Sequence, residues 1–181
     1  MTARAARPEP VRCAWAAREP LRSYHDLEWG TPLHDDRRLF EFLSLEGAQA
    51  GLSWETILRK RPAYRRAFAR FAPRRVSSFG ARDVARLLGD AGIVRNRAKI
   101  EATIANATAF LAVKREHGSF DRYVWGFTDP ASLSRELRDR GFRFVGPTIV
   151  ESFMEAVGIL DHHEPACFRR RSAPRAGARA R

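Results

Sequence analysis

Residues 132–160 read SLSRELRDRGFRFVGPTIVESFMEAVGIL, and their pattern is the most informative about the fold. Its first part has the apolar spacing of an amphipathic helix that Ser132 can cap and Gly141 can end. A short hairpin bounded by Gly141 and Gly146 follows, and Thr148 can cap a second helix. The stretch therefore predicts two helices joined by a tight corner between two glycines.

A corner of this kind exposes backbone N–H groups at the start of its second helix, where they can bind a phosphate. Such an arrangement is typical of the helix-hairpin-helix motif that holds a DNA backbone. The glycine spacing alone is a weak signal, because any corner between two helices can show it.

The rest of the chain repeats helical spacing. A long apolar-periodic run covers residues 96–117, and a shorter one covers 120–127. No sustained alternation with a period of two is present, and residues 142–144 alternate over too short a stretch for a strand. The predicted fold class is all-α, without internal repeats. Further helices are expected to begin at Asp35 or Asp36, at Pro62 and at Asp83.

The chain has 181 residues, of which 44% are hydrophobic, so one packed domain is expected. No apolar run approaches the roughly 20 residues that span a bilayer, and the first ten residues do not resemble a secretory signal. We expect a cytoplasmic bacterial protein with no membrane partner, associated with the nucleoid when it acts. We also expect a monomer, because no segment is typical of an obligate interface.

The positive charge is concentrated at the two ends of the chain. Of the net charge of +12, residues 1–12 carry +2 and residues 168–181 carry +6 through six arginines. Such ends attract any polyanion without sequence preference, although an arginine-rich composition can also reflect the base content of a genome. We predict a disordered basic arm over 1–11, one domain over 12–169 and a disordered arginine-rich tail over 170–181.

Two cysteines and several histidines form a candidate metal site. Cys167 lies four residues after His163, a spacing that lets both face one point on a helical turn, and Cys13 and His25 add a second pair. Two cysteines and two histidines match a closed tetrahedral zinc site. The alternative is two buried thiols and ordinary surface histidines, and His162 leaves the choice of ligand open.

Glu46 lies seven residues after Leu39 and three after Leu43, so a helix places its carboxylate on the apolar face. A buried carboxylate without a partner is costly, so either an arginine pairs with Glu46 or Glu46 lines a pocket. Aromatic walls around a carboxylate suit a flat ligand, although core packing also uses such residues. The aromatic residues that cluster in this part of the chain are Trp15, Tyr24, Trp29 and Trp54.

Taken together, these residues resemble the 3-methyladenine DNA glycosylase I family. The likeness extends over residues 12–169 and is densest in LEGAQAGLSW at 45–54. Other matching segments are RCAW at 12–15, YHDLEWG at 24–30, GIVRNR at 92–97 with KI at 99–100, RGFRFVGPT at 140–148, and His163 with CFR at 167–169.

The resemblance implies a helix-hairpin-helix glycosylase fold in which one structural Zn²⁺ joins the two ends of the domain. By position, its ligands would be Cys13, His25, His163 and Cys167. The same resemblance implies that the partner is damaged double-stranded DNA. The residues expected to contact DNA are Gly51 and Leu52 in one loop, and Gly141, Arg143, Gly146 and Thr148 in the hairpin.

The resemblance also implies the chemistry, which is removal of an adenine alkylated at N3 after it is flipped out of the duplex. Glu46 would be the catalytic carboxylate and, with Tyr24, would bind the base, while Trp54 would stack on it. Trp15 and Trp29 would complete the pocket. No lysine follows residue 119 to form a Schiff base with the sugar, so we predict a monofunctional enzyme that does not cleave the strand.

The chain departs from the family pattern at three places. Only residues 128–131 separate the aromatic segment at 125–127 from the next predicted helix, about twenty fewer than the family usually has, which brings DNA affinity and lesion range into question. Glu151 and Glu155 stand where the family favours an aromatic residue and an amide. Asp161 precedes two histidines and could occupy the place of a catalytic aspartate in related enzymes.

Three alternatives remain open from the sequence. The first is a glycosylase of the same fold for a different or bulkier purine adduct. The second is a DNA-binding homologue without catalysis, against which the base-pocket residues argue. The third is a zinc hydrolase, which would need an open coordination position on the metal.

Overall fold

The structure is a computed structural model that describes residues 9–171. Within this range every regular element is a helix and there is no strand, as predicted. The elements are η1 (Ala14–Ala16), α1 (Leu21–Leu27), α2 (Asp36–Gln49), α3 (Trp54–Ala67), η2 (Ala69–Phe71), α4 (Pro73–Val76), α5 (Ala81–Gly89), α6 (Arg97–His117), α7 (Phe120–Val124), α8 (Pro130–Asp139) and α9 (Pro147–Ala156).

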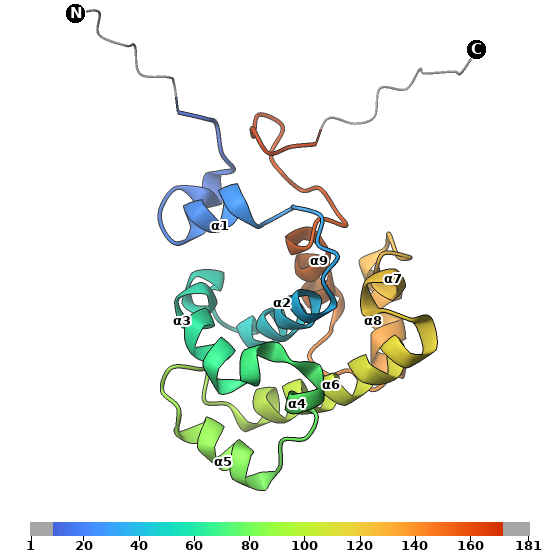
Figure 1. The fold of residues 1–181 in the computed structure, drawn as a ribbon. Coiled ribbons are helices and arrows are strands. Elements are labelled where there is room, and N and C mark those ends of the chain that lie inside the picture. The colour runs from blue at the N-terminus through green and yellow to red at the C-terminus, as the bar shows by residue number, and fades with distance from the viewer. Residues whose placement is uncertain (1–8, 172–181) are drawn as a thin grey trace, which may run out of the picture.

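Helix α2 is the central element of the domain (Figure 1). Every residue from Leu39 to Ala48 is buried, because α2 packs against α3, α6, α7 and α9. A helix that is covered on all sides buries its polar residues along with its apolar ones. Two glutamates, Glu41 and Glu46, are therefore inside the protein.

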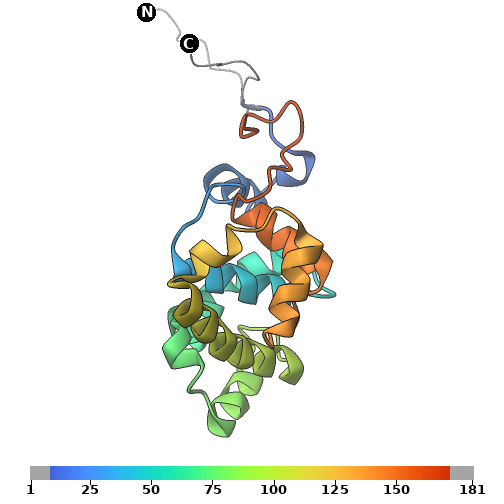
Figure 2. The same cartoon turned by 90° about the vertical axis from the view of Figure 1, so that its right-hand side faces the viewer.

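The two ends of the described chain meet at one end of the molecule, where both views show the N-terminal and C-terminal segments together (Figures 1 and 2). The backbone N–H of Phe168 donates to the carbonyl of Val11 at 2.9 Å. The predicted disordered segments 1–11 and 170–181 lie mostly outside the described residues. At their inner ends, Val11 accepts this bond and Arg170 donates to the carbonyl of His163 at 3.1 Å.

Several helices begin earlier than the sequence predicts. Helix α3 starts at Trp54, where the Ser53 side chain accepts from the Thr56 N–H, so Pro62 lies inside the helix rather than in its first turn. Helix α8 is capped by Asp129, not by Ser132.

Prolines account for the shifted starts of α8 and α9. Pro130 and Pro147 occupy first-turn positions, where the missing N–H of proline costs nothing. The N-cap of α9 is therefore Gly146, and the predicted cap at Thr148 is wrong. None of the helices in the described range is both long enough and apolar enough to cross a membrane.

Candidate active site and cysteine–histidine cluster

A cavity of about 340 Å³ lies where the C-terminal end of α2 meets α1, the start of α3 and α9. All five pocket residues predicted from the sequence line it, although they come from four different elements and the segment before α2. The full lining consists of Trp15, Leu21, Tyr24, Trp29, Glu46, Gln49, Ser53, Trp54, Glu55, Ser152 and Glu155.

Glu46 is the buried carboxylate of this cavity. The residue is 4% exposed, and its carboxylate makes no hydrogen bond or ion pair within residues 9–171. Burial, with a smaller contribution from the negative charge of Glu155, raises its pKa from 4.5 to about 8. Of the two possibilities that the sequence left open, the structure favours a pocket over an arginine partner.

Two of the residues that line the cavity carry buried hydrogen-bond donors. The hydroxyl of Tyr24 and the indole N–H of Trp54 have no hydrogen-bond partner among the described residues, and their rings lie 5.4 Å apart. Burial and the nearby Glu46 raise the pKa of Tyr24 well above its ordinary value, so its hydroxyl keeps its proton. Buried donors without partners are uncommon in proteins and mark a place for a ligand.

Trp15 and Trp29 form the side of the cavity nearest the chain ends. Their rings meet edge to face at 5.0 Å. Trp29 also contacts the ring of His163 at 4.5 Å, so one tryptophan separates the cavity from the cysteine–histidine cluster. Trp15 is 37% exposed, which leaves this side of the cavity open to solvent.

The loop between α2 and α3 carries Gly51 and Leu52, and Leu52 is 42% exposed at its tip. Lys99 of α6, to which the sequence assigned no role, donates to the carbonyls of Ala48 and Ala50 at 2.9 and 2.6 Å. These bonds satisfy carbonyls at the C-terminal end of α2, where a cation is also favoured. Lys99 thus fixes the base of the loop beside the cavity.

The corner between α8 and α9 contains the predicted hairpin. Gly141 has a φ of +87°, the left-handed conformation that ends α8. The buried Asn106 of α6 accepts from the N–H of Arg143 at 2.7 Å and donates to its carbonyl at 2.9 Å. Arg143 and Thr148 are exposed beside the corner. Asn106 holds the corner in one conformation, and nothing in the sequence pattern predicted this contact.

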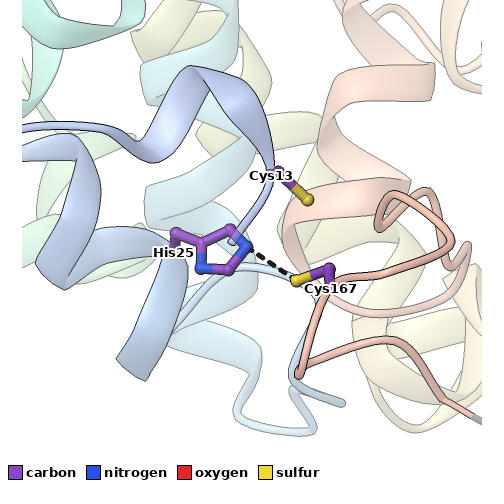
Figure 3. Close-up of side chains that lie close together, drawn as sticks. All are labelled: Cys13, His25 and Cys167. Atoms are coloured by element: carbon purple, nitrogen blue, oxygen red, sulfur yellow. Dashed lines mark hydrogen bonds between the residues drawn. The ribbon is translucent and has the colours of Figure 1, made fainter. Parts of the chain in front are cut away.

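The structure brings together three of the four predicted metal ligands, Cys13, His25 and Cys167 (Figure 3). Each offers a donor atom within 4.8 Å of the other two, and Nε2 of His25 lies 3.3 Å from Sγ of Cys167. Burial raises the pKa of the Cys13 thiol to about 11. A thiol in such surroundings keeps its proton unless a cation binds it.

The fourth predicted ligand, His163, is not part of that group, although its ring centroid lies 5.3 Å from that of His25. Its Nε2 atom is buried and has no hydrogen-bond partner among the described residues. Gly30, at a φ of +71°, packs against this ring so closely that an added Cβ would lie 2.3 Å from Cε1. His162, in contrast, is exposed and bonds to Glu155.

Two aspartates orient the two buried histidines. Asp26 bonds to Nδ1 of His25 and Asp161 bonds to Nδ1 of His163, each at 2.8 Å. Each bond leaves the Nε2 atom of its ring as the atom that can bind a metal, which is the carboxylate–histidine pattern common around zinc. Asp161 does not line the cavity, so its observed role is to hold His163.

The sequence matches the family model described as methyladenine glycosylase over residues 15–132 and 128–170. Among curated proteins, DNA-3-methyladenine glycosylase 1 of Escherichia coli (strain K12) is 44% identical, and the alignment covers 86% of this chain and 95% of that protein. The alignment is 177 positions long but includes only 86% of the 181 residues of this chain. About 21 positions of the alignment therefore have no residue of this chain.

Two solved structures are similar in fold and sequence. A crystal structure of 3-methyladenine DNA glycosylase I has a TM-score of 0.85 and 42% identity, and covers 89% of this chain and 100% of its own. A structure of 3-methyladenine DNA glycosylase I from Staphylococcus aureus, which is described as showing the structural basis of 3-methyladenine recognition, has a TM-score of 0.85 and 35% identity. The match covers 90% of this chain and 98% of that one.

The family match divides at residues 128–132, where the sequence is expected to be about twenty residues shorter than its relatives. In the structure this segment joins α7 to α8, and Asp129 begins α8. None of these residues lines the cavity, so the shortening leaves the cavity walls intact. With matches that span nearly the whole described chain, the chain belongs to the methyladenine glycosylase family.

Proposed function

We propose that the chain hydrolyses the N-glycosidic bond of 3-methyladenine after this base has been flipped out of duplex DNA. The observation that carries the proposal is Glu46, a buried carboxylate that has no partner within residues 9–171 and lies in an aromatic cavity. The names of the relatives, which are DNA-3-methyladenine glycosylases, support the same substrate.

Base recognition follows from the groups that face the cavity. An adenine alkylated at N3 carries a positive charge in DNA, so stacking on Trp54 favours it over neutral adenine. Glu46 accepts from the exocyclic amine and, once ionised, attracts the cation. The unpartnered hydroxyl of Tyr24 donates to an acceptor on the base. The damaged base also leaves the duplex stack more easily, which adds selectivity.

Bond cleavage needs little acid catalysis in this pocket. The alkylated base departs as a neutral molecule, so no group has to protonate it. Glu46 stabilises positive charge near the bond that breaks, and water then attacks the oxocarbenium-like sugar. Since no lysine follows residue 119, the sugar forms no Schiff base with that part of the chain, and the strand stays intact.

Release of free 3-methyladenine from methylated duplex DNA tests the proposal. Above pH 8, where Glu46 is ionised, we expect release by the unmodified protein and a loss of about 100-fold or more for Glu46→Gln, which keeps the shape but removes the charge. Glu101→Gln, at an exposed glutamate of α6, is the matched control and should retain activity. Absence of release by an unmodified protein that is folded and binds DNA would contradict the proposal.

A structural zinc ion is the proposed cofactor, held by Cys13, His25, His163 and Cys167. The donor set suits zinc, and the buried, unpartnered Nε2 of His163 supports the fourth ligand. When bound, Zn²⁺ would replace the thiol protons and join the segment before α1 to the C-terminal segment. With four protein ligands it would have no open position for water, so the site would have no part in the reaction.

Metal analysis of two neighbouring variants tests this assignment. His163→Gln should lower the zinc content of the purified protein and its melting temperature, whereas His162→Gln should retain one zinc per chain because His162 bonds to Glu155. Equal zinc content in both variants would remove His163 from the ligand set.

We also propose that the α8–α9 corner is a helix-hairpin-helix contact to the DNA backbone and that Leu52 fills the space left by the flipped base. The fixed corner and the exposed side chain of Arg143 support this proposal. Arg143→Ala should weaken binding to duplexes of any sequence and reduce its dependence on salt concentration. Unchanged salt dependence would place the backbone contact elsewhere.

A further inference from the structure

Two carboxylates besides Glu46 line the cavity, and the reaction described above uses neither. Glu55 of α3 is paired with Arg59 at 2.8 Å, which leaves Glu155 as the carboxylate without an arginine among the described residues. Glu155 of α9 lines the cavity with Glu46, and its side chain is 22% exposed. On its outer side it bonds to Nδ1 of His162, which fixes its position at the rim. Glu151, one turn earlier on α9, is exposed and does not line the cavity.

We propose that Glu155 determines the charge selectivity of this pocket, which would accept aromatic rings bearing a positive charge and discriminate against neutral rings of the same shape. The inference rests on the proposed function and specifies its substrate class by ring charge rather than by the position of one methyl group. Two carboxylates that face the same aromatic cavity attract a cation more strongly than one does.

The groups around Glu46 leave Glu155 as its charged neighbour. Tyr24 of α1 is neutral, and of the two α3 residues Trp54 is uncharged while Glu55 is paired with Arg59 at 2.8 Å. Lys99 of α6 is bound to the carbonyls at the end of α2. Burial raises the pKa of Glu46 to about 8, and the negative charge of Glu155 of α9 contributes the smaller part of this rise. A positive ring between the two carboxylates offsets this repulsion, whereas a neutral ring does not.

Ligand binding without turnover separates this inference from the proposed function. The probes are 1-methylquinolinium and quinoline, which have nearly the same shape and differ in charge. We expect the unmodified protein to prefer the cation, and Glu155→Gln to reduce the ratio of the two affinities by about tenfold. Glu151→Gln, the matched control on the same helix, should leave the ratio unchanged.

The pH dependence of base release gives a second readout, which a purely structural role would not change. Release of a cationic base should increase with pH until Glu46 is ionised, near pH 8 in the unmodified protein. In Glu155→Gln the midpoint should move about one pH unit lower, and Glu155→Asp, which keeps the charge, should restore most of the original profile.

An unchanged affinity ratio together with an unchanged midpoint in folded Glu155→Gln would overturn the inference. Should the protein fail to release 3-methyladenine but still show a charge preference that depends on Glu155, the proposed substrate would be wrong while the inference stands. If Glu155→Gln folds poorly, Glu155→Asp and Glu155→Ser replace it in the binding experiment. A preference for the cation that is kept in Glu155→Asp and lost in Glu155→Ser would support the inference, and an equal preference in the two variants would contradict it.

Discussion

Helix α2 buries two glutamates five residues apart, and the two have opposite surroundings. Glu41 accepts hydrogen bonds from Arg61 at 2.6 Å and from Arg65 at 2.9 Å, and Arg61 also bonds to Glu28. Glu46 has no such partner within residues 9–171 and faces a cavity with aromatic walls. Both carboxylates are about equally buried, at 5% and 4% exposure.

The difference between them is the one expected between a carboxylate that stabilises the fold and one that binds a ligand. A buried charge is tolerated when a partner compensates for it, as Arg61 does for Glu41. Without a partner the carboxyl group keeps its proton, and the fold is less stable than it could be. Such a cost persists where the group is needed for binding or catalysis. The comparison predicts how each of the two sites responds to substitution.

The largest expected effect is a pH-dependent penalty from Glu46. In the unfolded chain it ionises near pH 4.5, and in the folded protein near pH 8. Between these values the unfolded state releases its proton while the folded state keeps it, so the free energy of unfolding falls as pH rises. The loss reaches up to about 5 kcal/mol above pH 8 and is absent below pH 4.5.

Urea unfolding from pH 4 to pH 8 measures this penalty. Glu46→Gln should remove that part of the slope and become more stable than the unmodified protein at pH 8, while losing base release. Parallel pH profiles for the two proteins would mean that Glu46 has a partner after all.

Loss of Arg61 should destabilise the fold by about 3–5 kcal/mol, because Arg61→Ala leaves Glu41 buried without its main partner. Denaturant unfolding at neutral pH measures the change. A double variant that also carries Glu41→Gln should recover part of the loss, since it removes the unpaired charge. No recovery would indicate that Arg61 stabilises the fold through packing alone.

A smaller effect is expected for the wall of the pocket. Trp54→Ala should weaken binding of a flipped base by about 1–3 kcal/mol, the usual worth of stacking on an aromatic ring. The control is Trp125→Ala, since Trp125 stacks on His34 and does not line the cavity. That variant should lose stability but keep its affinity for the base. A loss of affinity in Trp125→Ala but not in Trp54→Ala would place the binding site elsewhere.

The smallest effect is expected for the outer partner of Glu41. Arg65 has a side chain that is 46% exposed, so Arg65→Ala should change the free energy of unfolding by less than about 1 kcal/mol. Comparing Arg65→Ala with Arg61→Ala tests whether burial or proximity alone determines how strongly an arginine stabilises Glu41. A loss equal to that of Arg61→Ala would contradict the role assigned to burial.

Much of the fold followed from the sequence, because helical periodicity and capping residues are local signals. The helix over residues 97–117 begins after Asn96 and ends before Gly118, close to its predicted limits. The start of α8 was misjudged because Asp129 and Pro130 together form a stronger signal than Ser132.

Less of the candidate site than of the fold could be predicted from the sequence. Spacing placed Glu46 on an apolar face but could not decide between a pocket and an arginine, because that depends on what α1, α3 and α9 bring beside it. Arg61 pairs with Glu41 instead, a contact across 20 positions that no periodicity encodes. Lys99 and the pocket position of Glu155 were missed for the same reason. The pairing of His162 with Glu155 also became visible only in three dimensions.

The hydrogen bonds from Lys99 to the carbonyls of Ala48 and Ala50 have a consequence for how the protein meets its substrate. The backbone at the base of the Gly51–Leu52 loop loses its conformational entropy when the chain folds, before any DNA is present. A loop that is already ordered loses little more freedom on association. In the role proposed for Leu52, the binding energy gained beside it would therefore go to unstacking a base pair, because the loop is already ordered.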